Sequence, residues 1–141
     1  MQNIEEIAAS TPRLEAMIFG MGDYSASQGL DFTTMFGPDY RYPGDVFHYA
    51  KFRVAMAARA RGIDAIDGPF ANIGNLEAYR ESCLQARALG MVGKWALHPT
   101  QIEHSQEIFT PDQSRIDEAR KMTAAYNESL AEGRGAVMID G

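Results

Sequence analysis

Asp23 is the residue whose type and position most directly suggest chemistry. It follows Leu14–Phe19, a mostly apolar stretch that predicts a buried strand, and it stands beside Gly20 and Gly22. In parallel α/β sheets, ligands lie at the carboxyl ends of the strands. Glycines there let backbone N–H groups approach an anion closely, and a neighbouring carboxylate can hold a hard cation such as Mg²⁺. The other interpretation is a carboxylate that only closes an Asx turn in a loop.

The two other predicted strand ends also carry groups that bind ligands. Asp67 begins an Asp-Gly-Pro-Phe run, and its carboxylate could equally close a turn by accepting hydrogen bonds from the N–H groups of Gly68 and Phe70. His98 is held extended by the proline after it, and a histidine in such a place is more often a hydrogen-bonded structural group than a catalyst. The chain has no Ser-His-Asp order, zinc-ligand spacing or phosphate-binding loop. We therefore assign no catalytic residue and expect an anion or metal site centred on Asp23.

Three strand-and-helix units must position these strand ends. Strands are expected at residues 14–19, 64–67 and 91–97, and an amphipathic helix follows each. The segment from Gly20 to Gly44 is typical of a long loop, and Asp45 of the N-cap of the helix after it. Repeated units of this kind give parallel strands with right-handed crossovers. Because a closed barrel needs eight strands, three of them predict an α/β chain that is part of a larger architecture.

A long C-terminal helix is predicted over residues 110–133. Thr110 as N-cap, Pro111 at the first helical position and Gln113 three residues on form a capping box at its start. Apolar residues then recur at helical spacing as far as Gly133. With no linker or low-complexity segment in the sequence, residues 1–141 are expected to form a single domain.

The composition narrows the class of protein without naming a partner. The chain has 141 residues, of which 45% are apolar and 23% charged, as in an ordinary soluble globule. The net charge of -6 and the scattered basic residues argue against nucleic acid as a partner. No apolar run approaches the ~20 residues that a membrane span needs, and the acidic N-terminus is unlike a signal peptide. We therefore expect a cytoplasmic protein that binds no membrane.

Several motifs together resemble one enzyme family. The motifs are Ile4–Leu14, the Gly22-Asp23 turn with Ser25–Ser27, Asp67–Phe70, Gly90–Pro99 and Phe109–Pro111. In this order they are similar to the malyl-CoA lyase and citrate lyase beta-subunit group of the HpcH/HpaI aldolase superfamily. The similarity runs over nearly the whole chain. Its most specific part is the Gly-Lys-Trp-x-x-His-Pro block that begins at Gly93.

The resemblance implies a Mg²⁺-dependent (β/α)₈ barrel of about twice this length. Members of the family are usually trimers or hexamers. They cleave or form a C–C bond in a CoA thioester, so that malyl-CoA and its relatives give acetyl- or propionyl-CoA and glyoxylate. This chain would then be the C-terminal part of such a barrel, a single partial-barrel domain over residues 1–141 with about three parallel strands and amphipathic helices.

By the same resemblance, particular residues receive roles. Asp23 matches one of two acidic Mg²⁺ ligands, and the N–H groups of Gly22 and Asp23 match those that hold the carboxylate of the 2-oxo acid. Asp67, Gly68 and Pro69 are similar to the segment beside the thioester arm of CoA. The second metal ligand, a Glu, would precede Met1, and the catalytic Asp would follow the C-terminus. The chain is therefore expected to need a complementary half-barrel; the alternative is a noncatalytic assembly module or an inactive fragment.

Overall fold

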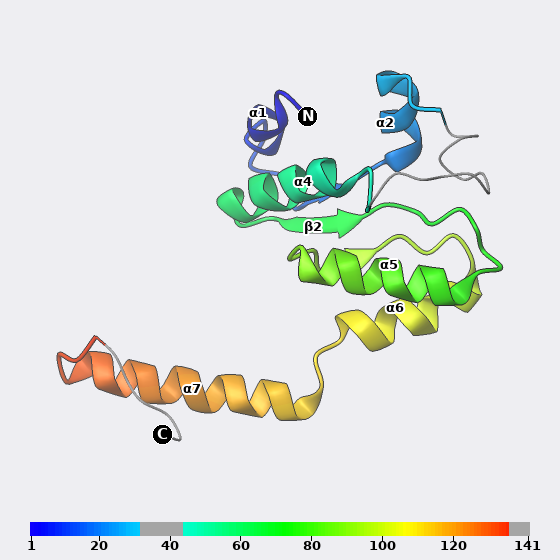
Figure 1. The fold of residues 1–141 in the computed structure, drawn as a ribbon. Helices are drawn as coiled ribbons and strands as arrows, with labels where there is room; N and C mark the ends of the chain where they lie inside the picture. The colour runs from blue at the N-terminus through cyan, green and yellow to red at the C-terminus, as the bar shows by residue number, and fades with distance from the viewer. Residues whose placement is uncertain (32–43, 136–141) are drawn as a thin grey trace. The chain divides into compact units, whose positions relative to one another are not determined.

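The computed structural model describes residues 1–31 and 44–135 of the chain. In the first compact unit, Met1–Phe109, the elements are α1 (Ile4–Ala8), β1 (Ala16–Ile18), α2 (Met21–Gln28), α4 (His48–Arg61), β2 (Asp64–Asp67), α5 (Leu76–Ala88), β3 (Gly93–Lys94), the 3₁₀ helix η1 (Pro99–Gln101) and α6 (Ile102–Phe109) (Figure 1). The second unit, Thr110–Gly141, holds α7 (Gln113–Ala131). All the predicted site residues belong to the first unit, and the expectation of a single domain stays a prediction.

The sheet has three parallel strands in the order β1-β2-β3. Ala16 pairs with Asp64 and Ile18 with Ile66, and Ile66 pairs in turn with Gly93. Because the strands are parallel and consecutive in the chain, their carboxyl ends meet at one edge of the sheet. The predicted α/β fold with three parallel strands is thereby confirmed, and the three strand ends do share one edge.

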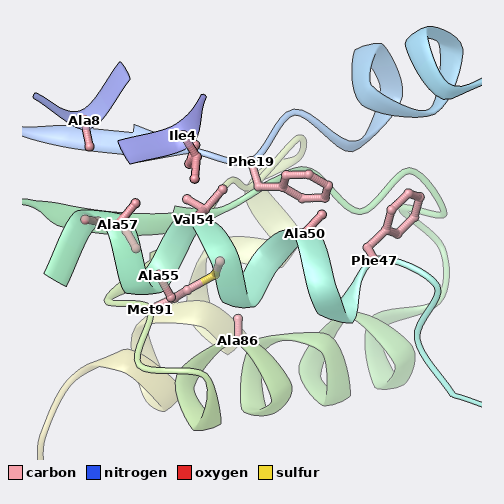
Figure 2. Close-up of a cluster of buried hydrophobic side chains, with 12 residues drawn as sticks. Ile4, Ala8, Phe19, Phe47, Ala50, Val54, Ala55, Ala57, Ala86 and Met91 are labelled. Atoms are coloured by element: carbon pink, nitrogen blue, oxygen red, sulfur yellow. The ribbon is translucent and has the colours of Figure 1, made fainter. Parts of the chain in front are cut away.

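A core of small and aromatic side chains packs α4 against β1 and β2 (Figure 2). Ala50, Val54, Ala57 and Ala58 recur along one face of α4, and all four are buried. Their small size lets the helix lie close to the sheet, while Phe19 fills the end of the core. Burying an aromatic side chain of that kind contributes roughly 1.5–3 kcal/mol. The core therefore holds the carboxyl end of β1 firmly against α4.

Further helices extend this core. Short α1 packs on α4, α5 packs on β2 and β3, and α6 packs on α5. Tyr79, Cys83 and Ile108 form a second buried cluster between α5 and α6. The guanidinium of Arg87 donates a hydrogen bond to the Ile108 carbonyl at the end of α6. Helices α4 and α5 therefore cover the sheet, and α6 packs on α5 as a further layer.

Residues 21–28 form a helix, which corrects the prediction of a loop from Gly20 to Gly44. The polar residues that indicated a loop satisfy themselves inside the helix: the Ser25 hydroxyl donates to the Met21 carbonyl at 2.7 Å, and the Ser27 hydroxyl to the Tyr24 carbonyl at 2.8 Å. Gly29, with a φ of 66°, ends the helix. Residues 32–43 of the expected loop lie outside the described residues.

The start of α4 was also predicted incorrectly. The helix begins at His48 with Phe47 as its N-cap, two residues later than the predicted N-cap Asp45. Asp45 instead accepts a hydrogen bond from the Phe47 N–H at 2.9 Å in the preceding turn. Its other carboxylate oxygen lies 3.0 Å from the ammonium of Lys51. Asp45 therefore forms an ion pair with Lys51 and does not cap α4. Gly62, with a φ of 68°, ends the helix as expected.

The third strand is shorter than predicted, Gly93–Lys94 in place of 91–97. Regular pairing ends because its neighbour β2 ends at Asp67, although the Trp95 N–H still donates to the Asp67 carbonyl at 3.0 Å. The chain then turns into η1, and the ring of His98 accepts a hydrogen bond from the Thr100 N–H. This contact agrees with the structural interpretation of His98.

Helix α7 runs from Gln113 to Ala131, inside the predicted range of 110–133. Its N-cap is Asp112 rather than the predicted Thr110. The Asp112 carboxylate accepts hydrogen bonds from the Arg115 N–H and the Ser114 hydroxyl, and a carboxylate in this place also favours the positive end of the helix. Neither α7 nor any other helix in the described parts of the chain is long and apolar enough to cross a membrane.

Candidate functional site

Gly68 brings the carboxyl ends of β1 and β2 into direct contact. A Cβ atom at this position would lie 2.0 Å from the Phe19 carbonyl oxygen and 3.6 Å from the Met21 nitrogen. Both of these atoms belong to the backbone and could not move aside as a flexible side chain could. Only glycine therefore fits, and the Gly68 main chain packs on the junction between β1 and α2.

The N-terminus of α2 presents donors and a carboxylate together. Gly22 and Asp23 stand in the first turn, where N–H groups have no partner inside a helix, and neither N–H donates to any other described residue. The Asp23 side chain is exposed and forms no ion pair within the described parts of the chain. Unpaired N–H groups and the helix dipole favour an anion here. That Gly22 and Asp23 bind an anion and a metal stays a prediction.

Asp67 has quite different surroundings, because it is 1% exposed and fully engaged. One carboxylate oxygen lies 2.5 Å from the Lys94 ammonium and 3.7 Å from that of Lys51. The other accepts a hydrogen bond from the Gly68 N–H at 2.9 Å, one of the two contacts that the turn interpretation predicted. The structure thus gives Asp67 two cationic partners inside the protein.

The two lysines are the part of the site that sequence reasoning missed. Lys51 comes from α4 and links Asp45 to Asp67, and Lys94 comes from β3 and also donates to the Gly68 carbonyl at 3.0 Å. Burial lowers the pKa of Lys94, and the neighbouring Asp67 carboxylate opposes that shift. A signal for Lys51 existed in the sequence, since it stands on the buried face of α4 between Phe47 and Val54, where a charge needs a partner.

A cavity of ≈ 770 Å³ lies beside this cluster. Phe47, Pro69 and Phe70 give it apolar walls, and Lys51 and Lys94 contribute polar atoms. Its volume falls in the range of ligand pockets, about 300–1,000 Å³. Of the residues predicted to bind substrate, Pro69 lines the cavity, whereas Gly22, Asp23, Asp67 and Gly68 do not.

Asp23 fits a role as one Mg²⁺ ligand. Mg²⁺ is commonly held by one or two carboxylates together with water and substrate oxygens. Asp23 is an exposed carboxylate beyond the end of β1 with no ion pair to any described residue, which suits such a site. No cluster of three or more His, Cys, Asp or Glu side chains suitable for a metal occurs in the described residues. A complete coordination sphere would therefore need oxygens from outside these residues.

Parallel strands whose carboxyl edge carries a helix N-terminus, an exposed carboxylate with no ion pair in the described residues and an adjoining cavity are typical of α/β barrel enzymes. Sequence comparison then gives the family. The profile of the HpcH/HpaI aldolase/citrate lyase family matches residues 1–99. The chain belongs to this family, which confirms the resemblance seen in its motifs.

Individual relatives agree with the family assignment. The L-malyl-CoA/beta-methylmalyl-CoA lyase of Rhodobacter capsulatus is 39% identical over 148 residues, which cover 99% of this chain and 46% of the relative. The malyl-CoA/beta-methylmalyl-CoA/citramalyl-CoA lyase of Chloroflexus aurantiacus is 32% identical and matches over 44% of its length. The chain therefore spans about half the length of the curated relatives it matches.

Solved structures show the same relation. Protein CitE from Mycobacterium tuberculosis, solved in complex with magnesium, acetoacetate and coenzyme A, superposes with a TM-score of 0.68 at 28% identity. That match covers 98% of this chain and 49% of the other. RipC from Yersinia pestis gives a TM-score of 0.69 at 33% identity, covering 80% of this chain and 48% of RipC. The fold is thus that of part of a citrate lyase-like barrel.

Proposed function

We propose that this chain supplies the metal carboxylate and the 2-oxo acid donors of a Mg²⁺-dependent C–C lyase that acts on CoA thioesters of the malyl-CoA type. The reaction would give acetyl- or propionyl-CoA and glyoxylate. The names of the lyase relatives and the magnesium and coenzyme A in the CitE structure support this proposal. Because the chain spans about half of those relatives, activity would depend on a complementary half-barrel.

Each part of the site has one role in this proposal. Asp23 would hold Mg²⁺, and the N–H groups of Gly22 and Asp23 would bind the carboxylate of the 2-oxo acid at the N-terminus of α2. The cavity beside Pro69 and Phe70 would take the thioester arm. The metal, when bound, supplies a Lewis acid that polarises a carbonyl oxygen. We assign no catalytic acid or base to this chain.

One observation carries the proposal: at the carboxyl edge of a parallel sheet, the N–H groups of Gly22 and Asp23 and the Asp23 carboxylate stand together, and none of them has a partner among the described residues. An anionic ligand and a cation can be bound side by side there, as the cleavage of a 3-hydroxyacyl thioester to an acyl-CoA and a 2-oxo acid requires. The other strand-end carboxylate, Asp67, is neutralised by Lys94 and is not free for such a role.

The direct test measures glyoxylate release from malyl-CoA. The 141-residue chain is assayed with Mg²⁺ alone and after mixing with the N-terminal half of the Rhodobacter capsulatus relative. We expect activity only in the mixture. Activity of the chain alone would refute its dependence on a second half, and no activity in either sample would refute the proposed function. Release of free malate would instead indicate thioester hydrolysis, which the name of a 32% identical relative, a (3S)-malyl-CoA thioesterase of Cereibacter sphaeroides, makes worth measuring.

A pair of variants locates the activity at the rim. Asp23→Asn should lower the rate of the mixture by about a hundredfold or more, because metal catalysis contributes several kcal/mol to the transition state. Asp64→Asn is the matched control, since Asp64 is an exposed carboxylate at the opposite end of β2. Equal losses in the two variants would contradict the role of Asp23.

The alternative function is a noncatalytic half-barrel that assembles with a copy of itself. Two observations favour it: in the described residues β1 and β3 each pair only with β2, and Ile18 and Trp95 are 53% and 51% exposed. Open sheet edges of this kind favour association. Sedimentation velocity distinguishes the two functions, because self-association that Ile18→Ser abolishes and the equally exposed control Met56→Ser preserves would support assembly. A monomer at all concentrations would refute this alternative.

A further inference from the structure

We propose that Lys94 is a positioning residue for the N-terminus of α2, and that it acts through Asp67 and Gly68. This inference rests on the proposed function only for its consequence, the orientation of Gly22 and Asp23 toward a metal and an anion. The contacts that carry it are properties of the protein itself.

The Gly68 segment is held from two directions by one ion pair. Lys94 donates to the Gly68 carbonyl at 3.0 Å, and its ion-pair partner Asp67 accepts from the Gly68 N–H at 2.9 Å. The Lys94 and Asp67 side chains are 3% and 1% exposed, so water does not compete for these contacts. The main chain of Gly68 is thus fixed by buried, charge-assisted hydrogen bonds.

Gly68 passes this constraint to the start of α2. Its Cα faces the Phe19 carbonyl so closely that a Cβ would come to 2.0 Å, and the Met21 nitrogen would be the next backbone group reached, at 3.6 Å. The Phe19 N–H is also bonded to the Ile66 carbonyl at 3.1 Å, so β1 cannot slide past β2. Phe19 and Met21 flank Gly20, the N-cap of α2. A displacement of Gly68 therefore displaces the first turn of α2, in which Gly22 and Asp23 stand.

Lys51 cannot replace Lys94 in this role. Its ammonium lies 3.7 Å from Asp67 and 3.0 Å from Asp45, and no hydrogen bond joins it to Gly68 in the described residues. The cluster has two positive and two negative charges. Lys51 therefore pairs mainly with Asp45, and Lys94 pairs with Asp67. Lys94 alone contacts both Asp67 and the Gly68 carbonyl.

The test reads the backbone of α2 directly by ¹⁵N NMR of the 141-residue chain. Lys94→Met should shift the amide signals of Met21, Gly22 and Asp23, and it should increase the hydrogen exchange of Tyr24, whose N–H donates to the Gly20 carbonyl. It should also weaken Mg²⁺ binding by about tenfold, measured from the change in those amide signals during a Mg²⁺ titration. Tenfold is the lower end of the loss usual when a residue that supports a metal ligand is removed. Arg80→Met is the control, because it breaks an exposed ion pair with Glu107 between α5 and α6.

A second variant keeps the test decisive if Lys94→Met leaves the remaining charges too poorly balanced to fold. The double variant Asp67→Asn/Lys94→Met removes both charges of the pair, while the amide oxygen can still accept from the Gly68 N–H. The same shifts at Gly22 and Asp23 are expected. Signals at these positions that match those of Arg80→Met in a folded single or double variant would overturn the positioning role.

The outcomes separate this inference from the proposed function. If Mg²⁺ gives no response even when the unaltered chain is mixed with the N-terminal half of the relative, but Lys94→Met moves the α2 amides, the proposed function fails and the positioning role stands. If Mg²⁺ binds near Asp23 with equal strength in the unaltered chain and in Lys94→Met, and the amides do not move, the positioning role fails and the metal site stands.

Discussion

Asp23 and Asp67 follow neighbouring strands of one sheet, yet they are opposites in environment. Asp23 is exposed, has no ionic partner in the described residues and lies beside unpaired N–H groups. Asp67 is buried, and its oxygens meet two ammonium groups and the N–H of Gly68. A carboxylate free of protein partners can take a ligand at little cost, whereas one neutralised inside the protein must first give up its partners. We therefore infer that the strand end at Asp23 is available for a ligand, and that the strand end at Asp67 stabilises the backbone beside it.

The largest expected effect comes from removing the buried charge. Asp67→Asn leaves two buried ammonium groups short of a counter-charge and should lower the free energy of unfolding by about 3–5 kcal/mol. Asp23→Asn should lower it by no more than about 1 kcal/mol, since Asp23 has no ion-pair partner in the described residues and loses only its interaction with the positive end of α2. The fluorescence of Trp95, the single tryptophan, reports urea unfolding of the first unit in both variants. Similar urea midpoints for the two variants would contradict the claim that Asp67 stabilises the fold and Asp23 does not.

A smaller effect is expected at the glycine that connects the two strand ends. Gly68→Ala places a Cβ against the Phe19 carbonyl and should cost about 1–3 kcal/mol of stability through forced backbone shifts. Gly22→Ala is the matched control, because no atom lies within 4 Å of its added Cβ and alanine is the better helix former. Urea unfolding should show a loss for the first and none for the second. A Gly68→Ala protein as stable as the unaltered chain would argue against a tight contact there.

The pH dependence of stability should show the burial of Lys94. Because its pKa is lowered in the folded state, the unfolded chain holds a proton that the folded chain has released at pH values between that pKa and 10.5. Lys94 therefore contributes a stability that rises with pH in that window and is flat below it. Burial raises the pKa of Cys83, which gives the opposite slope above pH 9.0. The measured quantity is the stability of the unaltered chain minus that of Asp67→Asn/Lys94→Met, and a difference that falls with pH would contradict this sign.

The smallest effect concerns Asp112, an exposed carboxylate that does have partners. The Ser114 hydroxyl, followed by the Arg115 N–H, lowers its pKa below the usual 3.8. A depressed pKa means that the capping contribution is present above pH 3.8 and is lost as the pH falls through the folded-state value. The NMR signals of Ser114 and Arg115 should therefore show fraying of the first turn of α7 at low pH. Asp112→Ala should fray at all pH values, and unchanged signals in that variant would show that the cap is not needed.

Much of the fold could be predicted from the sequence because hydrophobic periodicity reports it directly. The three strands, the helix after each of the last two, and the end of α4 at Gly62 all follow from local patterns. The predicted boundaries were wrong where several side chains could bind the same backbone groups. Asp112, rather than Thr110, caps α7. In α2, the hydroxyls of Ser25 and Ser27 donate to carbonyls of the helix itself, so these residues do not form a loop. The length of the third strand depended on where its neighbour β2 ends, which no local pattern in residues 91–97 contains.

The site was predictable only in part. Gly22 and Asp23 stood out because glycine and a carboxylate followed a strand, and the structure places both in the first turn of α2. Asp67 carried the same local signal, but its burial depends on Lys51 and Lys94, which are 16 and 27 residues away in the chain. A pairing over such separations is a tertiary property, so Asp67 could not be distinguished from Asp23 by spacing alone.

Paramagnetic broadening by Mn²⁺ tests the division between the two carboxylates most directly. Mn²⁺ takes the same oxygen ligands as Mg²⁺, and it broadens the NMR signals of amides close to its site. In the presence of glyoxylate, we predict broadening centred on Gly22, Asp23 and Tyr24 that Asp23→Asn abolishes and Asp64→Asn leaves in place. Broadening centred on Asp67 and Lys94, or broadening that survives Asp23→Asn, would contradict the account.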